Sequence, residues 1–392
     1  MITPNTKAQK VKSSATISIT MRANELKAEG KNVISLAAGQ PDFDTPEHIK
    51  QACIDALLAG KTKYTPPNGT LPLRKAISVK FLNDNNLEYS PEQIVVSCGA
   101  KHSLYNIFQL LLEEDDEVII PQPYWVSYPE FVTLAGGKSV FVQTKEENNF
   151  LISPEQLEAA ITEKTKALVL NSPSNPTGMA YNVDALKSLG EVLKKHTQIA
   201  IVSDEIYEDL TYGGFKHTSF ATAVPELYDR TFTVNGFSKT YSMTGWRLGY
   251  TGCPNVETAG AMKKIQAHST TGTTSFTQDG GVAALTAGKD CVEQMRKAFD
   301  ERREFIVNAL NEIPGIKCLN PQGAFYVFPN ISAWGIPSLE LATRLLEEIN
   351  IAVIPGVAFG ADENIRISFA TSLEDLKEAV ARLKDWVSEN IK

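Results

Sequence analysis

The chain has 392 residues, of which 43% are hydrophobic and 21% are charged, and its formal net charge is -8 at pH 7. The length favours one large domain with a smaller one, and the composition is ordinary for a globular protein. The negative charge argues against nucleic acid or an anionic membrane surface as a partner, and no apolar run is long enough to span a bilayer. Five scattered cysteines without a CxxC pair predict reduced thiols, no zinc site and a cytoplasmic location.

The predicted elements alternate between strands and helices through the middle of the chain. Short apolar runs are followed by amphipathic segments, which is typical of a mostly parallel sheet covered by helices on both faces. Sites in such sheets form at the carboxyl ends of the strands. The expected strands are residues 92–99, 116–122, 138–144, 166–173, 198–205 and 231–238, and the expected helices are 100–114, 153–162 and 182–196.

The last hundred residues have a different pattern. Strands expected at 323–331 and 364–370 lie among helices, and the chain ends on an amphipathic helix from 371. Thr371 and Glu374 have the spacing of a capping box at the start of that helix. We expect a large domain at 46–289 and a smaller α+β domain made of 1–45 together with 290–392.

The segment SCGAKHSLYN places small residues where the first expected strand meets its helix. Gly99 and Ala100 would let backbone N–H groups approach an anion at the positive end of the helix dipole. The alternative is an ordinary strand-to-helix turn, in which glycine is common. This motif therefore favours a phosphate site only in combination with other residues.

Charged residues follow two further strands. Asp204, in VSDEIYEDL, is either the counter-ion of a cationic ring nitrogen or a helix N-cap, since a carboxylate after an apolar strand is costly without a cation. Lys239, after TFTVNG, is either a solvated lysine or a desolvated amine whose lowered pKa makes it a nucleophile. Arg247 could neutralise a phosphate near that amine. Together these residues suit a ligand with a phosphate, a ring nitrogen and an aldehyde, which describes pyridoxal 5'-phosphate.

The motifs NSPSNPTG, SDEIYE and SKTYSMTGWRLGY, with SLAAGQPDFDTP and NIRISFA, resemble those of the class I aminotransferases of pyridoxal-phosphate fold type I. The resemblance covers nearly the whole chain and is closest to the prokaryotic-type aspartate aminotransferases, a branch that includes prephenate aminotransferases. It implies an α/β fold with a mostly parallel mixed sheet between helices, plus the smaller α+β domain. It also implies a homodimer with shared active sites and ping-pong transfer of an amino group through a lysine Schiff base.

The resemblance implies a role for each matching position. Lys239 would bind the cofactor covalently and move the substrate proton, Asp204 would pair with the ring nitrogen, and Tyr207 would hydrogen-bond the phenolic oxygen. Further cofactor contacts are implied for Asn175, Trp125, Gly99, Ala100, Lys101, Ser238, Arg247 and, from the second subunit, Tyr64. Substrate contacts are implied for Gly39, Trp125, Asn175, Arg366, Lys101 and Thr16. Without the resemblance, Arg366 would be interpreted as a charge at a strand edge and Thr16 as a helix N-cap.

The substrate follows from two of these positions. Animal-type aspartate aminotransferases read the distal carboxylate with an arginine from the partner subunit, but this sequence has no arginine between Arg247 and Arg296. The prokaryotic-type branch uses a lysine and an N-terminal threonine, which match Lys101 and Thr16. The resemblance therefore implies aspartate and 2-oxoglutarate as substrates, with prephenate as an additional acceptor.

Other functions remain as alternatives. The same cofactor would serve an aminotransferase for aromatic or alanine-type amino acids, or a β-lyase. The fold would also suit a ligand-sensing module of a transcription regulator, but such proteins need a DNA-binding segment, which neither the short N-terminus nor the acidic balance supplies. A structural protein would have no reason to retain Lys239, Asp204, Asn175 and Arg366 together.

Overall fold

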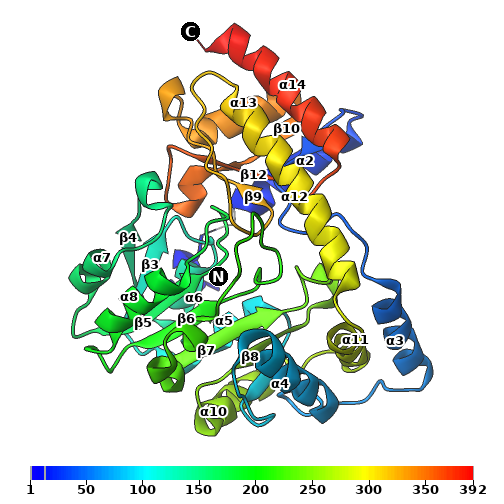
Figure 1. Cartoon of the computed structure of the whole chain (residues 1–392), viewed down its shortest axis with the longest axis vertical. Coiled ribbons are helices and arrows are strands. Elements are labelled where there is room, and N and C mark those ends of the chain that lie inside the picture. The colour runs from blue at the N-terminus through cyan, green and yellow to red at the C-terminus, as the bar shows by residue number, and fades with distance from the viewer. Residues whose placement is uncertain (1, 13–14, 392) are drawn as a thin grey trace.

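The structure is a computed structural model that describes residues 2–12 and 15–391 (Figure 1). The side chains of residues 15–17, which include Thr16, lie outside the described part. Within the described ranges, no helix combines the length and the apolar character needed to cross a membrane.

A seven-stranded sheet forms the centre of the larger part of the molecule. Its strands lie in the order β2 (Ile94–Ser97), β8 (Gly249–Gly252), β7 (Thr231–Gly236), β6 (Ala200–Asp204), β5 (Thr165–Asn171), β3 (Glu117–Gln122) and β4 (Lys138–Gln143). β8 runs antiparallel to both neighbours, while the other neighbouring pairs are parallel. The predicted mostly parallel sheet is confirmed, and six of its strands occupy the expected segments.

β8 is not among the strands expected from the sequence, and its glycines explain why. A strand of four residues with glycine at both ends lacks the β-branched run that marks its neighbours. Glycine is nevertheless required, because a Cβ on Gly249 would lie 2.2 Å from the backbone nitrogen of Ala100. The strand thus passes directly beneath the start of the helix that follows β2.

Helices cover both faces of the sheet (Figure 1). Alternate residues of β3 point in opposite directions, so that Val118 and Ile120 pack in one buried cluster and Ile119 in another. The first cluster contains side chains of α5 (Ala100–Leu111), α6 (Tyr128–Ala135) and α10 (Val256–Ala267), and the second those of α7 (Pro154–Ala160), α8 (Val183–Leu193) and α9 (Phe220–Ala223). A third cluster lies at the β2 end and includes side chains of α4 (Leu71–Asn85), with α3 (Glu47–Leu58) and α11 (Ser275–Thr286) beside it.

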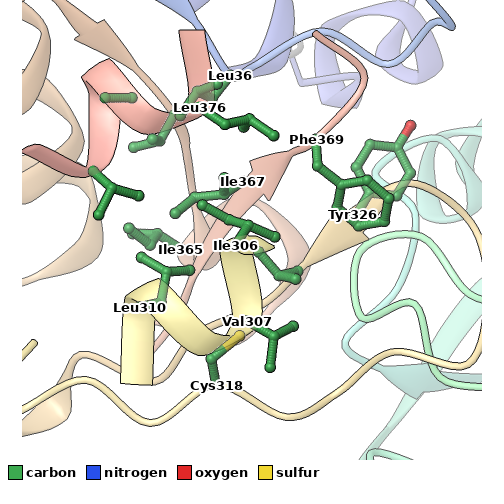
Figure 2. Close-up of a cluster of buried hydrophobic side chains, with 14 of the residues drawn as sticks. Leu36, Ile306, Val307, Leu310, Cys318, Tyr326, Ile365, Ile367, Phe369 and Leu376 are labelled. Atoms are coloured by element: carbon green, nitrogen blue, oxygen red, sulfur yellow. The ribbon is translucent and has the colours of Figure 1, made fainter. Parts of the chain in front are cut away.

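The C-terminal part has its own core. β12 (Ile365–Ser368) lies between β11 (Ile354–Pro355) and β9 (Tyr326–Val327) in an antiparallel sheet, packed against α12 (Asp290–Asn311), α13 (Ser338–Ile349) and α14 (Leu373–Asn390). Figure 2 shows Ile306 and Leu310 of α12 facing Ile365 and Ile367 of β12. This core is apolar throughout, so it holds the strands of the smaller part as one unit.

The N-terminal segment joins that core. β1 (Ile34–Ser35) pairs in parallel with β10 (Ile351–Ala352), and α2 (Ala15–Ala28) contributes Ala23 and Leu26 to a cluster with Phe359. A short helix, α1 (Thr6–Lys10), lies farther out against α6. β1 and α2 thus pack with the smaller part, whereas α1 packs on the larger one, and the division into 46–289 and 1–45 with 290–392 stays a prediction.

The start of α14 differs from the expected capping box. Its N-cap is Ser372, whose hydroxyl accepts from the N–H of Asp375. Thr371 instead donates its hydroxyl to the Asp375 side chain over 2.8 Å. The predicted Thr371–Glu374 box is therefore wrong by one residue, because a second hydroxyl residue follows the first and satisfies the same backbone group.

Candidate active site

A cavity of about 550 Å³ opens where the carboxyl ends of β5, β6 and β7 meet the smaller part of the molecule. Its walls come from these strand ends, the first residues of α5, the segment 37–40 and the strands of the smaller part. Among the residues singled out from the sequence, the cavity is lined by Gly39, Ala100, Lys101, Trp125, Asn175, Asp204, Tyr207, Ser238, Lys239, Arg247 and Arg366.

Two of the predicted residues that the structure describes, Gly99 and Tyr64, do not line this cavity. Gly99 lies just behind its wall, against Arg247. Tyr64 is 95% exposed and belongs to a loop between α3 and α4. The side chain of Thr16 lies outside the described residues, so its predicted contact with the substrate and the alternative of a helix N-cap both stay predictions.

Lys239 follows β7 directly and reaches the cavity half-buried. Its ammonium donates to the carbonyl oxygen of Gly39. Burial, followed by the positive charges of Arg366 and Arg247, lowers the pKa of Lys239 to about 7, against the opposing effect of Asp204. The alternative of an ordinary solvated lysine is therefore wrong, because the side chain is half-buried in the cavity wall and its pKa is far below the usual lysine range.

Asp204 ends β6 and is 4% exposed. Its Oδ2 accepts from the hydroxyl of Tyr128 over 2.7 Å, and its Oδ1 accepts from the N–H of Ile206 over 3.3 Å. Burial raises the pKa of Asp204 to about 6, although both hydrogen bonds and Lys239 favour the carboxylate. Residues 206–209, which follow Asp204, form turns and not a helix. The alternative of Asp204 as a helix N-cap is therefore wrong.

Arg366 lies in the middle strand of the small sheet and is 2% exposed, which excludes the alternative of a charge at a strand edge. Its two terminal nitrogens donate to Asn175 Oδ1 over 3.0 Å and to the carbonyl of Ala37 over 2.7 Å. Its Nε has no hydrogen-bond partner among the described residues. A buried guanidinium with unused donor capacity beside a cavity suits a carboxylate ligand.

The turn between β2 and α5 forms a concave backbone surface. Gly99 has φ 82°, and a Cβ there would lie 2.7 Å from an Arg247 nitrogen. Arg247 has φ 54° itself, and its guanidinium donates to the carbonyl of Thr244 over 2.8 Å. The N-terminus of a twelve-residue helix, a buried Ser238 and this arginine therefore meet at one end of the cavity, which is an arrangement that binds anions.

Lys101 and Trp125 lie on the wall next to that anion site. The Lys101 ammonium is 5.0 Å from the centre of the Trp125 ring, within cation–π range. Desolvation, followed by the charge of Arg247, lowers the pKa of Lys101. Lys101 thus adds a cation to the cavity wall beside those of Arg247 and Arg366, so that the cavity can take more than one negative group.

Two tyrosines in the site were not predicted from the sequence. Tyr128 holds Asp204, as described above, and the Tyr326 hydroxyl lies 2.9 Å from that of Tyr207. Both tyrosines are buried, and a buried tyrosine hydroxyl needs a hydrogen-bond partner. The only local signal was the place of Tyr326 in the apolar run 324–328, and the sequence around Tyr128 carried none.

A network of buried charges lies behind Asp204. The neighbouring Glu205 accepts from His217 Nε2 over 3.1 Å and from the Ser219 hydroxyl over 2.5 Å. Farther along, Glu208 pairs with Lys80, which is 7% exposed. Each of the two carboxylates is paired with a basic group, so the charges of this buried cluster balance one another. The cluster thereby stabilises the turn next to Asp204.

The fold and the cavity define a class of enzyme. A strand-end lysine with a depressed pKa, a buried carboxylate and a buried arginine face one cavity above a mostly parallel sheet, as in group-transfer enzymes that act on carboxylated substrates. Sequence and structure comparisons agree with that description. The family model for "Aminotransferase class I and II" matches residues 31–383.

Individual relatives match over nearly their full length. The aspartate aminotransferase of Bacillus subtilis (strain 168) is 52% identical over 382 residues, covering 96% of this chain and 97% of that protein. The aspartate/prephenate aminotransferase of Cereibacter sphaeroides is 49% identical over 385 residues, covering 96% of each. The structure of Thermus thermophilus aspartate aminotransferase with maleate has a TM-score of 0.94 at 43% identity, covering 98% of this chain and all of that one.

The chain belongs to the class I and II aminotransferase family. It is an aminotransferase with the α/β architecture of fold type I, as expected from its motifs.

Proposed function

We propose that this enzyme uses pyridoxal 5'-phosphate to move the amino group between L-aspartate and 2-oxoglutarate. The observation that carries the proposal is the pairing of Lys239, with a pKa of about 7, and Asp204, with a pKa of about 6, on one cavity. An amine that is neutral near pH 7 suits attack on an aldehyde, and a buried carboxylate without a cation suits a protonated ring nitrogen.

The residues present fit the remaining groups of this cofactor. The phosphate would bind at the N-terminus of α5, held by the backbone of Gly99, Ala100 and Lys101, and by Ser238 and Arg247. A Cβ at position 99 would fill the space next to the Arg247 guanidinium, so the glycine keeps this recess open. The recess is therefore of the right chemistry and shape for an anion.

The ring of the cofactor has partners on the opposite wall. Trp125 would lie against its face, and Asn175 with Tyr207 would hydrogen-bond its phenolic oxygen. When bound, the cofactor supplies a conjugated cationic ring that withdraws electrons from the substrate α-carbon. Asp204 would keep the ring nitrogen protonated, because a cation directly beside a buried carboxylate offsets the cost of its burial.

Lys239 performs the proton transfer. With the cofactor bound, its neutral amine would take up and return the proton of the substrate α-carbon. The backbone carbonyl of Gly39, which accepts from the Lys239 amine, holds the side chain over the cavity. Burial, together with the charges of Arg366 and Arg247, lowers the pKa of this amine and so favours its neutral form.

Arg366 binds the α-carboxylate of the substrate. Its orientation is fixed by Asn175 and Ala37, which occupy one donor on each terminal nitrogen and leave Nε and the remaining N–H groups available. A fixed carboxylate holds the α-carbon near Lys239, so proximity lowers the barrier to proton transfer.

Specificity for aspartate and glutamate rests on Lys101. Its ammonium stands at the cavity wall over Trp125, where a second carboxylate of the substrate can reach it. We propose that Thr16 assists, as the family resemblance implies. Relatives named aspartate aminotransferase support this substrate, one of them solved with the dicarboxylate maleate, and those named aspartate/prephenate aminotransferase favour prephenate as a second acceptor.

The active unit we propose is a homodimer with shared sites. Tyr64 is 95% exposed, and the nearby helix α3 exposes Ile54, Leu57 and Leu58 at 45%, 48% and 80%. An apolar face of this kind beside an exposed tyrosine suits a second copy whose phosphate site receives Tyr64. We further propose a cytoplasmic location, which the free thiols of all five cysteines support.

The substitution Lys101→Ser tests the substrate. We expect kcat/KM for aspartate and glutamate to fall about 10–100-fold, since a charge-assisted contact is lost, with little change for alanine or tyrosine. Lys187→Ser, on the exposed face of α8, serves as the matched control. Equal losses for all amino acids would contradict the assignment, and release of pyruvate and ammonia from cysteine would favour the β-lyase.

A further inference from the structure

Tyr326 connects two functional side chains of the cavity, Tyr207 and Arg366, which share no hydrogen bond with each other among the described residues. Its hydroxyl lies 2.9 Å from the Tyr207 hydroxyl, and its ring centre lies 4.5 Å from the Arg366 Cζ. Tyr326 belongs to β9 of the smaller part, whereas Tyr207 follows β6 of the larger part. One side chain therefore touches the arginine proposed for the substrate carboxylate and the tyrosine proposed for the cofactor.

The position of Tyr326 is fixed on every side. It is fully buried and packs against Phe325 and, edge to face, against Tyr207. Figure 2 shows it at the border of the small hydrophobic core, with its hydroxyl pointing away from that core. Gly39 leaves room for the hydroxyl, because a Cβ there would lie 3.3 Å from the Tyr326 oxygen.

The number of protons decides the direction of this hydrogen bond. Each phenol has a single proton, and either oxygen can donate to the other. If Tyr207 donates to a ligand in the cavity, its oxygen must accept from Tyr326. A tyrosine that accepts one hydrogen bond is polarised and donates a stronger one.

We propose that Tyr326 is a positioning residue that directs the Tyr207 proton into the cavity and strengthens its donation, while the Tyr326 ring supports the Arg366 guanidinium. The inference rests on the proposed function, because the acceptor of the Tyr207 proton is the phenolic oxygen of pyridoxal 5'-phosphate. Hydroxyl and ring then have separate tasks. The hydroxyl acts on the cofactor through Tyr207, and the ring acts on the substrate carboxylate through Arg366.

Two substitutions separate these tasks. Tyr326→Phe removes the hydroxyl and keeps the ring, and Tyr326→Leu removes both. The readout for the hydroxyl is the pH midpoint at which the yellow lysine–cofactor band of the holoenzyme converts to its deprotonated form. We expect this midpoint to rise by roughly 0.3–1 unit in Tyr326→Phe, since weaker donation to the phenolic oxygen leaves more negative charge to retain the proton.

Binding of maleate, an unreactive dicarboxylate, reports on the ring. We expect Tyr326→Phe to bind it within about twofold of the unmodified enzyme, and Tyr326→Leu to bind it about 10-fold more weakly. Tyr212→Phe is the matched control, since the Tyr212 hydroxyl is also buried but donates to the Ala324 carbonyl over 2.5 Å. This control should leave both readouts unchanged.

A double substitution tests whether the effect passes through Tyr207. In a Tyr207→Phe background, adding Tyr326→Phe should not move the midpoint further. An unchanged midpoint in the single Tyr326→Phe variant, or the same additional shift in both backgrounds, would overturn the inference while leaving the proposed function intact. A protein that forms no yellow band with pyridoxal 5'-phosphate would overturn the proposed function as well.

Discussion

The hydroxyl of Tyr128 donates to Asp204 Oδ2 over 2.7 Å, although the two residues lie 76 positions apart in the chain. Tyr128 opens α6 and Asp204 closes β6, so the bond joins a covering helix to the end of a central strand. It is a hydrogen bond to a carboxylate in a buried site, where such a bond is strong. Tyr128 therefore helps to keep Asp204 ionised against the cost of burial.

Replacing Tyr128 by Phe should reduce kcat by about 10-fold, because the pKa of Asp204 would rise further above about 6 and its hold on the ring nitrogen would weaken. Steady-state kinetics and the dissociation constant for pyridoxal 5'-phosphate provide the measurement. Tyr181→Phe is the control, since the Tyr181 hydroxyl accepts from the N–H of Ile152 away from Asp204. Similar effects of the two substitutions would show that the Tyr128 bond is only structural.

Arg366→Lys should raise KM for amino and 2-oxo acids by about 10–100-fold, because lysine cannot reproduce the planar arrangement of donors that Asn175 and Ala37 orient. The kcat of the saturated enzyme should change less. Arg344→Lys, in an ion pair with Glu348 on the surface of α13, is the comparison. If KM were unchanged in Arg366→Lys, the proposed carboxylate site would be wrong.

The pKa of Lys239, about 7, predicts unusual reactivity in the cofactor-free protein. Treatment with pyridoxal 5'-phosphate and borohydride across a pH series should label Lys239 with a half-maximal extent near pH 7, since only the neutral amine reacts. Peptide mass mapping identifies the labelled residue and compares it with the exposed Lys187. A midpoint for Lys239 near the ordinary lysine value would contradict the described environment.

His217 predicts a pH-dependent stability. Burial alone would lower its pKa, but its hydrogen bond and charge interaction with Glu205 raise the pKa above the ordinary value of 6.5. Since the folded-state pKa exceeds the unfolded one, this stabilisation is fully present below about pH 6.5 and is lost as the pH rises through the folded-state pKa.

Thermal unfolding of the unmodified protein and of His217→Gln between pH 5 and 9 measures this effect. The difference in unfolding temperature between the two proteins should be largest at the acidic end and should shrink as the pH rises. A difference that stays constant over this range would mean that His217 is not protonated in the folded protein.

The strands that precede the two charged residues could be predicted because each is a short run rich in β-branched and apolar residues, with Asp204 at the end of one and Lys239 three positions beyond the other. β8 could not, since its two terminal glycines serve a close approach to Ala100 that only the folded chain creates. Local patterns thus located most of the sheet, while the contacts between its elements required the structure.

The residues of the site likewise fall into those that could be predicted from the sequence and those that could not. Motif resemblance located Lys239, Asp204 and Arg366, which the structure brings to one cavity. The local sequence does not reveal the partners of Tyr128 and Tyr326, because these partners lie 76 and 119 residues away. Tertiary hydrogen bonds of that range are invisible to periodicity and spacing.

The visible absorption spectrum of the protein, reconstituted with pyridoxal 5'-phosphate and then mixed with L-aspartate or L-glutamate, tests the central claim most directly. The proposed function predicts a yellow band that disappears on addition of either amino acid and returns with 2-oxoglutarate, and a Lys239→Ala variant that forms no covalent adduct. A protein that remains colourless, or whose band does not respond to either amino acid, would contradict it.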